Sequence, residues 1–138
     1  MTTEARPAQP TPRVLIVEDE LMIRIMLEDM LRDLGYAIAG EAGRVDEALE
    51  VANKVDFDLA ILDVNLNGEP VLPVADALAA RGTPFVFATG YGDGGLPEAH
   101  RTRPMLKKPF EVDALKRVLE STVRRRNTAP GQQDQSHP

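Results

Sequence analysis

The chain contains no cysteine, and this absence excludes a disulfide framework and any thiolate-ligated metal site. It also has no apolar run that approaches the roughly 20 residues of a membrane-spanning helix, and residues 1–12 lack the apolar segment of a secretory signal. Positive charge is scarce, since the formal net charge is −6, which argues against general nucleic-acid binding. We therefore expect a cytoplasmic protein with no membrane insertion and no nucleic-acid partner.

The remaining composition is that of a globular domain with two polar ends. The length of 138 residues predicts one domain, and a hydrophobic fraction of 43% permits a real core. Residues 1–12 are rich in proline and threonine, and residues 127–138 are polar, so both segments are predicted to be disordered. This leaves residues 13–126 for the folded domain.

Short apolar segments alternate with amphipathic ones through this domain. The glycine-rich residues 90–95 weaken any fourth helix, which is predicted to be short or mobile. The alternation predicts an α/β fold: a parallel sheet of five strands in the flavodoxin-like order 2-1-3-4-5, with helices on both faces. By run length and periodicity, the strands are residues 14–17, 36–42, 59–62, 85–88 and 105–107, and the helices are residues 21–34, 46–54, 71–81, 96–101 and 111–125.

Asp63 directly follows the third predicted strand, and Asn67 and Gly68 then break the backbone. Ligands of open α/β sheets bind beyond the carboxyl ends of the strands, so Asp63 is a candidate functional carboxylate. An aspartate beside asparagine and glycine also commonly serves only to form a turn. Asp63 by itself is compatible with both interpretations. The residues that follow the other strands are needed to distinguish them.

Polar residues follow the other strands as well: Glu18 and Asp19 after the first, Thr89 after the fourth and Lys108 after the fifth. Because parallel strands end at the same edge of a sheet, these side chains should lie close to Asp63. Clustered carboxylates raise one another's pKa unless a cation compensates, and an all-oxygen cluster suits Mg²⁺. A lysine and a magnesium ion beside a carboxylate predict an acceptor site for a phosphoryl group.

The five residues, in this order and each at a strand end, resemble the receiver domain of bacterial two-component response regulators. The resemblance covers residues 13–124. It implies that Asp63 accepts a phosphoryl group as an acyl phosphate. It further implies that Mg²⁺ is held by Glu18, Asp19, Asp63 and the main-chain carbonyl of Asn65.

The same resemblance assigns the other two side chains and the partners. Thr89 would donate a hydrogen bond to the phosphoryl group, and Lys108 rather than Lys107 would pair with it. The Lys108–Pro109 peptide bond is a candidate cis bond, as is common in this family. A histidine kinase or a histidine phosphotransfer protein would supply the phosphoryl group, and a downstream protein would respond to it. We expect docking at the exposed edge that contains Pro109 and Phe110. The protein would act in signalling and not as an enzyme, although slow autodephosphorylation is compatible with this role.

Two positions depart from the common receiver pattern. Most receivers have an aromatic residue three positions before the lysine, where this chain has Met105. The motif Phe-Ala-Thr-Gly-Tyr at residues 87–91 resembles a subgroup of stand-alone receivers, and it makes Tyr91 a candidate for the displaced switch aromatic. The alternative is an ordinary loop tyrosine with a solvated hydroxyl. A small residue at Gly90 leaves the site open to a bulky phosphodonor. The switching face is expected to comprise the loop after the fourth strand, the fifth strand and the last helix.

Other interpretations are weaker. A haloacid-dehalogenase-type phosphotransfer enzyme uses the same residue types but needs a second acid where this chain has Asn65. A receiver-shaped binding module that works without phosphate is compatible with Met105. Residues 90–95 formally match a dinucleotide-binding glycine pattern but open no firm helix, so we interpret them as a loop. We further expect Asp19 to cap the first helix near Glu20, and His100 and His137 to be surface residues.

Overall fold

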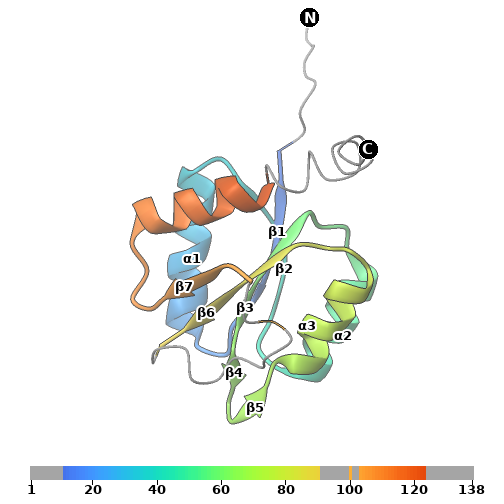
Figure 1. Cartoon of the computed structure of the whole chain (residues 1–138). Coiled ribbons are helices and arrows are strands. Elements are labelled where there is room, and N and C mark those ends of the chain that lie inside the picture. The colour runs from blue at the N-terminus through green and yellow to red at the C-terminus, as the bar shows by residue number, and fades with distance from the viewer. Residues whose placement is uncertain (1–10, 91–99, 101–102, 124–138) are drawn as a thin grey trace, which may run out of the picture.

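The structure is a computed structural model that describes residues 11–90, 100 and 103–123. Its main sheet contains five parallel strands in the order β2-β1-β3-β6-β7 (Figure 1). β6 and β7 are the fourth and fifth strands of this sheet, so the predicted α/β fold and strand order are confirmed. The strands are β1 (Arg13–Val17), β2 (Ala37–Ala42), β3 (Leu59–Asp63), β6 (Phe85–Thr89) and β7 (Met105–Lys107).

Helices cover both faces of the sheet, as the sequence predicts. Figure 1 shows α1 and the last helix on one side of the sheet, and α2 and α3 on the other. The predicted fourth helix lies, apart from residue 100, outside the described residues. The described helices are α1 (Leu21–Asp33), α2 (Val45–Lys54), α3 (Leu72–Ala80) and the last helix at residues 112–123.

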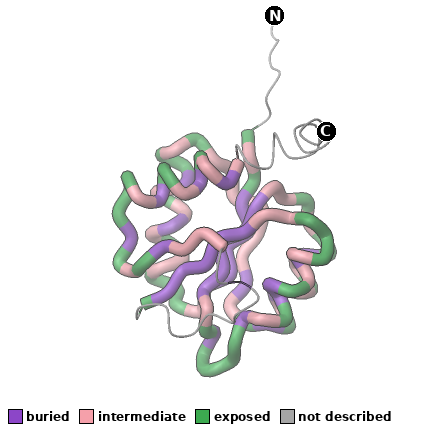
Figure 2. Tube along the Cα trace, viewed as in Figure 1, coloured by how far each residue is buried: buried purple, intermediate pink, exposed green. Residues whose placement is uncertain are grey.

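The sheet separates two apolar cores because successive strand residues point to opposite faces. In β1, Leu15 and Val17 pack with the α2 and α3 side, whereas Val14 and Ile16 pack with the α1 side. All five residues of β3 are buried, and Figure 2 shows buried chain through the centre of the sheet. This burial on both faces explains why the strands appear in the sequence as continuous apolar runs.

A small hairpin follows β3, where the sequence predicted only a turn. β4 (Asn65–Leu66) pairs antiparallel with β5 (Glu69–Pro70). The two residues between them, Asn67 and Gly68, have φ angles of 53° and 87°. A two-residue hairpin turn of this kind requires positive φ at both central positions, and Asn-Gly is the dipeptide that favours it most. The sequence signal for the hairpin was therefore present.

The capping role predicted for Asp19 is wrong. Glu20 occupies the N-cap of α1, and no side chain caps this helix end. The Asp19 Oδ2 atom instead accepts a hydrogen bond of 3.0 Å from the main-chain N–H of Asn67, which lies 48 residues away in the chain. Asp19 therefore makes a long-range hydrogen bond with the hairpin instead of the local helix-capping bond that its residue type suggests.

The surface position predicted for His100 is also wrong. Only 4% of this residue is exposed, and its Nε2 atom lies 2.9 Å from Oδ1 of Asp76 on α3. Its ring stands edge-on to Phe85 and Phe87, with centroid distances of 5.7 and 5.9 Å. An isolated histidine gives no local signal of such packing, which depends on strands distant in sequence. His137 lies outside the described residues.

Candidate functional site

Three acidic side chains meet at the carboxyl edge of the sheet. Glu18 and Asp19 follow β1, and Asp63 ends β3, its neighbour in the sheet. One carboxylate oxygen from each of the three lies within 4.8 Å of the others. Glu18 and Asp63 are buried, and Asp19 is partly exposed. The structure thus brings together the three acids that the sequence placed at two strand ends.

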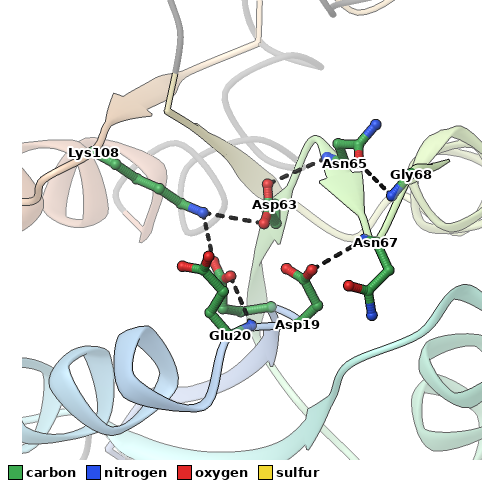
Figure 3. A network of polar contacts seen from close by, with 8 residues as sticks. Asp19, Glu20, Asp63, Asn65, Asn67, Gly68 and Lys108 are labelled. Atoms are coloured by element: carbon green, nitrogen blue, oxygen red, sulfur yellow. Dashed lines mark hydrogen bonds and ion pairs between the residues drawn. The ribbon is translucent and has the colours of Figure 1, made fainter.

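Lys108 reaches the same cluster from the end of β7. Its Nζ atom lies 2.9 Å from Oε1 of Glu18 and 3.1 Å from Oδ2 of Asp63 (Figure 3). Its main-chain N–H donates a hydrogen bond of 2.8 Å to the carbonyl of Thr89, which ties the ends of the fourth and fifth strands together. Lys107 is exposed, so Lys108 is the lysine at the cluster. The Lys108–Pro109 bond is cis, as the resemblance implied.

Among the described residues, Lys108 is the cation that contacts this acid cluster. Burial raises the pKa of Glu18 to about 7, although Lys108 and the N–H of Glu20 oppose this rise. Burial also raises the pKa of Asp63 above its ordinary value, against the opposing effect of Lys108. Burial alone would lower the pKa of Lys108, but its hydrogen bonds to Glu18 and Asp63 raise it overall. Lys108 thus pairs with Glu18 and Asp63, and Asp19 adds a third carboxylate to the cluster.

This donor set fits a magnesium ion. All the side chains that could coordinate a metal here are carboxylates, and hard divalent cations such as Mg²⁺ prefer oxygen ligands. Mg²⁺ commonly binds through one or two carboxylates and keeps other positions for water or a phosphate. Burial raises the pKa values of Glu18 and Asp63, and a divalent cation bound beside the two carboxylates would lower both by favouring their charged forms.

A cavity of about 750 Å³ opens at the cluster. Thr89 and Gly90 line it from the end of β6, opposite Asp19 and Glu20. A Cβ atom added at Gly90 would lie 3.9 Å from Cδ of Lys108, an ordinary contact distance, so a methyl group fits there and a longer side chain would approach the lysine. The cavity is larger than a phosphoryl group needs, so a side chain that carries one could enter.

Main-chain N–H groups orient each of the three carboxylates. Glu18 Oε2 accepts a hydrogen bond of 3.1 Å from Glu20, and Asp63 Oδ1 accepts one of 3.2 Å from Asn65. Asp19 accepts its bond from Asn67, a residue that the sequence analysis did not select. The Asn65 side-chain oxygen accepts a hydrogen bond of 2.7 Å from the N–H of Gly68 (Figure 3). The Asn65 side chain therefore stabilises the hairpin. The ligand role of the Asn65 carbonyl stays a prediction.

The expected switch residues are only partly described. Met105 is partly buried, pairs with Phe87 between β6 and β7, and packs against the core on the α2 and α3 side. Thr89 is buried at the end of β6, with 8% of its surface exposed. Tyr91 lies outside the described residues, so its role as a displaced switch aromatic stays a prediction.

The predicted docking edge needs a correction. Pro109 is exposed, but Phe110 is 6% exposed and belongs to the core on the α1 side, so it cannot serve as an exposed contact. In the part of the chain that the structure describes, the exposed large apolar side chains are Val112, at the start of the last helix, and three residues at the start of α1. Leu21, Met22 and Ile25 have exposed fractions of 60%, 78% and 46%.

Comparison with known families accounts for this arrangement of strand ends. The family model described as the response regulator receiver domain matches residues 14–120. The chain belongs to the response regulator receiver family. The match spans every strand that contributes a residue to the cluster.

Individual relatives agree with this assignment. The chain is 40% identical over 128 residues to the transcriptional regulatory protein PdtaR of Mycobacterium tuberculosis, which covers 90% of this chain and 62% of that protein. The receiver chain thus spans less than two thirds of the length of that relative. The solution structure of SdrG from Sphingomonas melonis Fr1 is 46% identical, with a TM-score of 0.74, and covers 82% of this chain and 97% of that one.

A second solution structure of SdrG, described as the BeF3-activated conformation, is also 46% identical, with a TM-score of 0.71, and covers 80% of this chain and 95% of that one. The receiver relatives are regulatory proteins. Among the described residues of this chain, no helix is both long enough and apolar enough to cross a membrane.

Proposed function

We propose that this receiver accepts a phosphoryl group on Asp63 in a reaction that depends on Mg²⁺. The observation that carries this proposal is the position of the Asp63 carboxylate. It lines an open cavity, 3.1 Å from Lys108 Nζ and within 4.8 Å of two further acids. A lone turn-forming aspartate would not need a partly buried lysine and two acids around it. The match to the receiver family over residues 14–120 supports the same chemistry.

Each residue has a distinct part in the proposed reaction. A carboxylate oxygen of Asp63 forms a bond to phosphorus as the bond from phosphorus to the donor's histidine nitrogen breaks. The bonding pair stays with the imidazole. Lys108, already beside Asp63, would pair with a phosphoryl oxygen, and the Thr89 hydroxyl would donate a hydrogen bond to another. Mg²⁺, when held by Glu18, Asp19, Asp63 and the main-chain carbonyl of Asn65, supplies positive charge to the phosphoryl oxygens.

The donor is a histidine kinase or a histidine phosphotransfer protein. A protein-bound phosphohistidine can reach Asp63 only if its carrier covers the mouth of the cleft. The exposed Leu21, Met22 and Ile25 lie next to that mouth, because α1 begins directly after the cleft residue Glu20. Clustered exposed apolar residues commonly mark protein contacts. We assign the donor's contact to this start of α1, in place of the edge at Phe110.

Phosphorylation would change the face formed by the ends of β6 and β7. A phosphoryl group adds up to about two negative charges and three strong acceptors. Because the main chains of Thr89 and Lys108 are hydrogen-bonded to each other, movement of either toward the phosphoryl group would displace both strand ends. A downstream protein that binds this face would distinguish the two states. Phosphate shifts an equilibrium that already exists, so the unphosphorylated protein should sample both conformations.

A trapping experiment tests the phosphorylation site. The protein is incubated with acetyl phosphate, with and without Mg²⁺, and the product is reduced with borohydride and mapped by peptide mass spectrometry. We expect a reduced residue at position 63 that forms only when Mg²⁺ is present. Labelling at another residue, or labelling that does not need a divalent cation, would overturn the proposal. Continuous release of phosphate at a high rate would favour a phosphotransfer enzyme instead.

Three finer statements stay predictions of the sequence. These are a stand-alone role in signalling, a cytoplasmic location, and domain limits at residues 13 and 126. The exchange of phosphate in a relay, in either direction, is compatible with an acyl phosphate on Asp63.

A further inference from the structure

We propose that the tip of the β4–β5 hairpin is a positioning device for the metal site. Asn67 and Gly68 form this tip, and they would set the affinity for the divalent cation by holding the Asp19 carboxylate in place. This inference rests on the proposed function, because it concerns the cation that phosphorylation would require. It goes further by assigning a role to two residues that contact neither the phosphoryl group nor the ion.

The hairpin contacts the acid cluster at two points. Its tip donates the Asn67 N–H to Asp19 Oδ2 at 3.0 Å, and its first residue donates the Asn65 N–H to Asp63 Oδ1 at 3.2 Å (Figure 3). Asp19 follows β1, whereas Asp63 is the last residue of β3. The hairpin, residues 65–70, therefore fixes the positions of the Asp19 and Asp63 carboxylates relative to each other.

The hairpin is held internally, so its tip can act as a fixed support. The Asn65 side chain accepts a hydrogen bond of 2.7 Å from the Gly68 N–H, and strands β4 and β5 pair across the turn. At the base, the Val71 N–H donates a 3.0 Å bond to the carbonyl of Val64. These bonds set the direction in which the Asn67 N–H points. That direction in turn depends on positive φ at both turn residues.

The hydrogen bond from Asn67 leaves Asp19 able to bind a metal. An ionised carboxylate has two oxygens and about four acceptor positions, and the turn uses one of them. The N–H thus orients the group without blocking it. Hydrogen bonds of this kind to metal-binding side chains commonly tune affinity, and their loss costs about tenfold or more. Asp19 needs such support more than Glu18 and Asp63, because it is partly exposed and has no ion pair with Lys108 among the described contacts.

Two glycine substitutions form a matched test. Gly68 has φ of 87° and Gly82, which follows α3, has φ of 74°; at both positions an added Cβ would meet no atom within 4 Å. Alanine therefore adds similar backbone strain at each position without a steric clash. Gly82 precedes β6 and lies at the opposite edge of the sheet from the cluster. Gly68→Ala disturbs the proposed support, and Gly82→Ala controls for loss of stability alone.

The measurement is the Mg²⁺ dissociation constant by calorimetry, with urea unfolding recorded for each protein. We expect Gly68→Ala to bind Mg²⁺ about tenfold more weakly than the wild type, and Gly82→Ala to bind it with wild-type affinity despite a similar loss of stability. Equal Mg²⁺ affinity in all three proteins would overturn the positioning role. A wild-type protein that binds no Mg²⁺ would instead overturn the proposed function itself.

A second pair of variants keeps the test independent of glycine. Asn67→Gly retains both the N–H and the freedom to adopt φ of 53°, so it should bind Mg²⁺ as the wild type does. Asn67→Val places a β-branched residue at positive φ and should weaken Mg²⁺ binding about as much as Gly68→Ala does. If Asn67→Gly and Asn67→Val bound the ion equally well, the turn geometry would have no part in setting affinity.

Discussion

Two aspartates flank the same strand, and they have opposite surroundings. Asp58 precedes β3, where its Oδ2 atom accepts a 2.7 Å hydrogen bond from the Arg13 N–H, and its own N–H donates a 2.8 Å bond to the Arg13 carbonyl. This exchange closes the amino end of the β1–β3 pair. Asp63 ends β3, is 7% exposed and faces Lys108 and two other acids. The same residue type hydrogen-bonds to the backbone at one edge and belongs to a cluster of acids around a lysine at the other.

Strand direction explains this difference. At the carboxyl edge, the order β2-β1-β3-β6-β7 places the acids that follow β1 on one side of Asp63, and Thr89 and Lys108 on the other. At the amino edge, the chain enters β2, β3 and β6 from helices that lie on one or other face of the sheet. Asp58 there meets the backbone of the neighbouring strand. Ligand sites of open α/β sheets lie beyond the carboxyl ends for this reason.

The strongest test of this comparison exchanges each aspartate for asparagine. Asp63→Asn should lose Mg²⁺-dependent labelling by acetyl phosphate completely, because an amide cannot form the acyl phosphate. Asp58→Asn should be labelled as the wild type is, since the asparagine carbonyl can still accept the Arg13 N–H. The measurement is the mass of the intact protein after incubation. Loss of labelling in Asp58→Asn with the fold intact would show that the two edges are not functionally separate.

Much of this organisation was accessible from the sequence. Continuous apolar runs predict the three central strands β1, β3 and β6, because both faces of the sheet are covered there. The rules for βαβ units predict a parallel sheet, and the flavodoxin-like order adopted for it is the one observed. The residue types at the strand ends then predict which side chains meet, and Glu18, Asp63 and Lys108 do meet. Sequence reasoning succeeds here because topology, rather than side-chain detail, brings these residues together.

The errors arose where a long-range contact replaced a local preference. Asp19 has the residue type of a helix cap, but it accepts the Asn67 N–H from the hairpin. His100 appeared to be an isolated polar residue, but it packs against Phe85 and Phe87. Phe110 was assigned to an exposed edge and is buried in the core. Local sequence does not specify which face of a loop the rest of the chain will cover.

A comparison of two adjacent lysines should give the next largest effect. Lys108→Ala removes the ammonium group from a partly buried acid cluster, and loss of one partner from a buried ion pair costs on the order of 3 kcal/mol. We expect a loss of that order in the unfolding free energy of the metal-free protein at pH 8. Mg²⁺ should restore part of it. Lys107→Ala, at an exposed neighbouring position, should stay within about 0.5 kcal/mol of wild type.

Urea unfolding of each variant, with and without Mg²⁺, gives these values. A loss of stability for Lys108→Ala that matched that of Lys107→Ala would mean that the carboxylates do not depend on the lysine for charge balance.

The stability of the metal-free protein should depend on pH because of Glu18. Burial raises its pKa from 4.5 to about 7, so the folded state binds the proton more tightly than the unfolded state does. The stabilising contribution is complete below pH 4.5 and is lost as the pH rises through about 7. We expect unfolding free energy to fall between these limits by on the order of 2 kcal/mol. Asp63, whose pKa is also raised, adds to the same trend.

Glu18→Gln supplies the control for this pH profile. An amide does not titrate, so urea unfolding of this variant across the same pH range should show a smaller decrease. If wild type and Glu18→Gln lost stability in parallel, other groups would be responsible for the trend.

Apart from the control variant Lys107→Ala, the smallest expected effect belongs to the amino edge. Asp58→Ala removes the acceptor for the Arg13 N–H, but the N–H of residue 58 keeps its bond to the Arg13 carbonyl. The site is open to water, so solvent can replace the lost acceptor, and we expect a cost of about 1 kcal/mol in unfolding free energy. Mg²⁺ should raise the urea midpoint of this variant by the same increment as in the wild type. A smaller increment would mean that a change at the amino end of β3 weakens Mg²⁺ binding at its carboxyl end. The surroundings of Asp58 and Asp63 would then not be independent of each other.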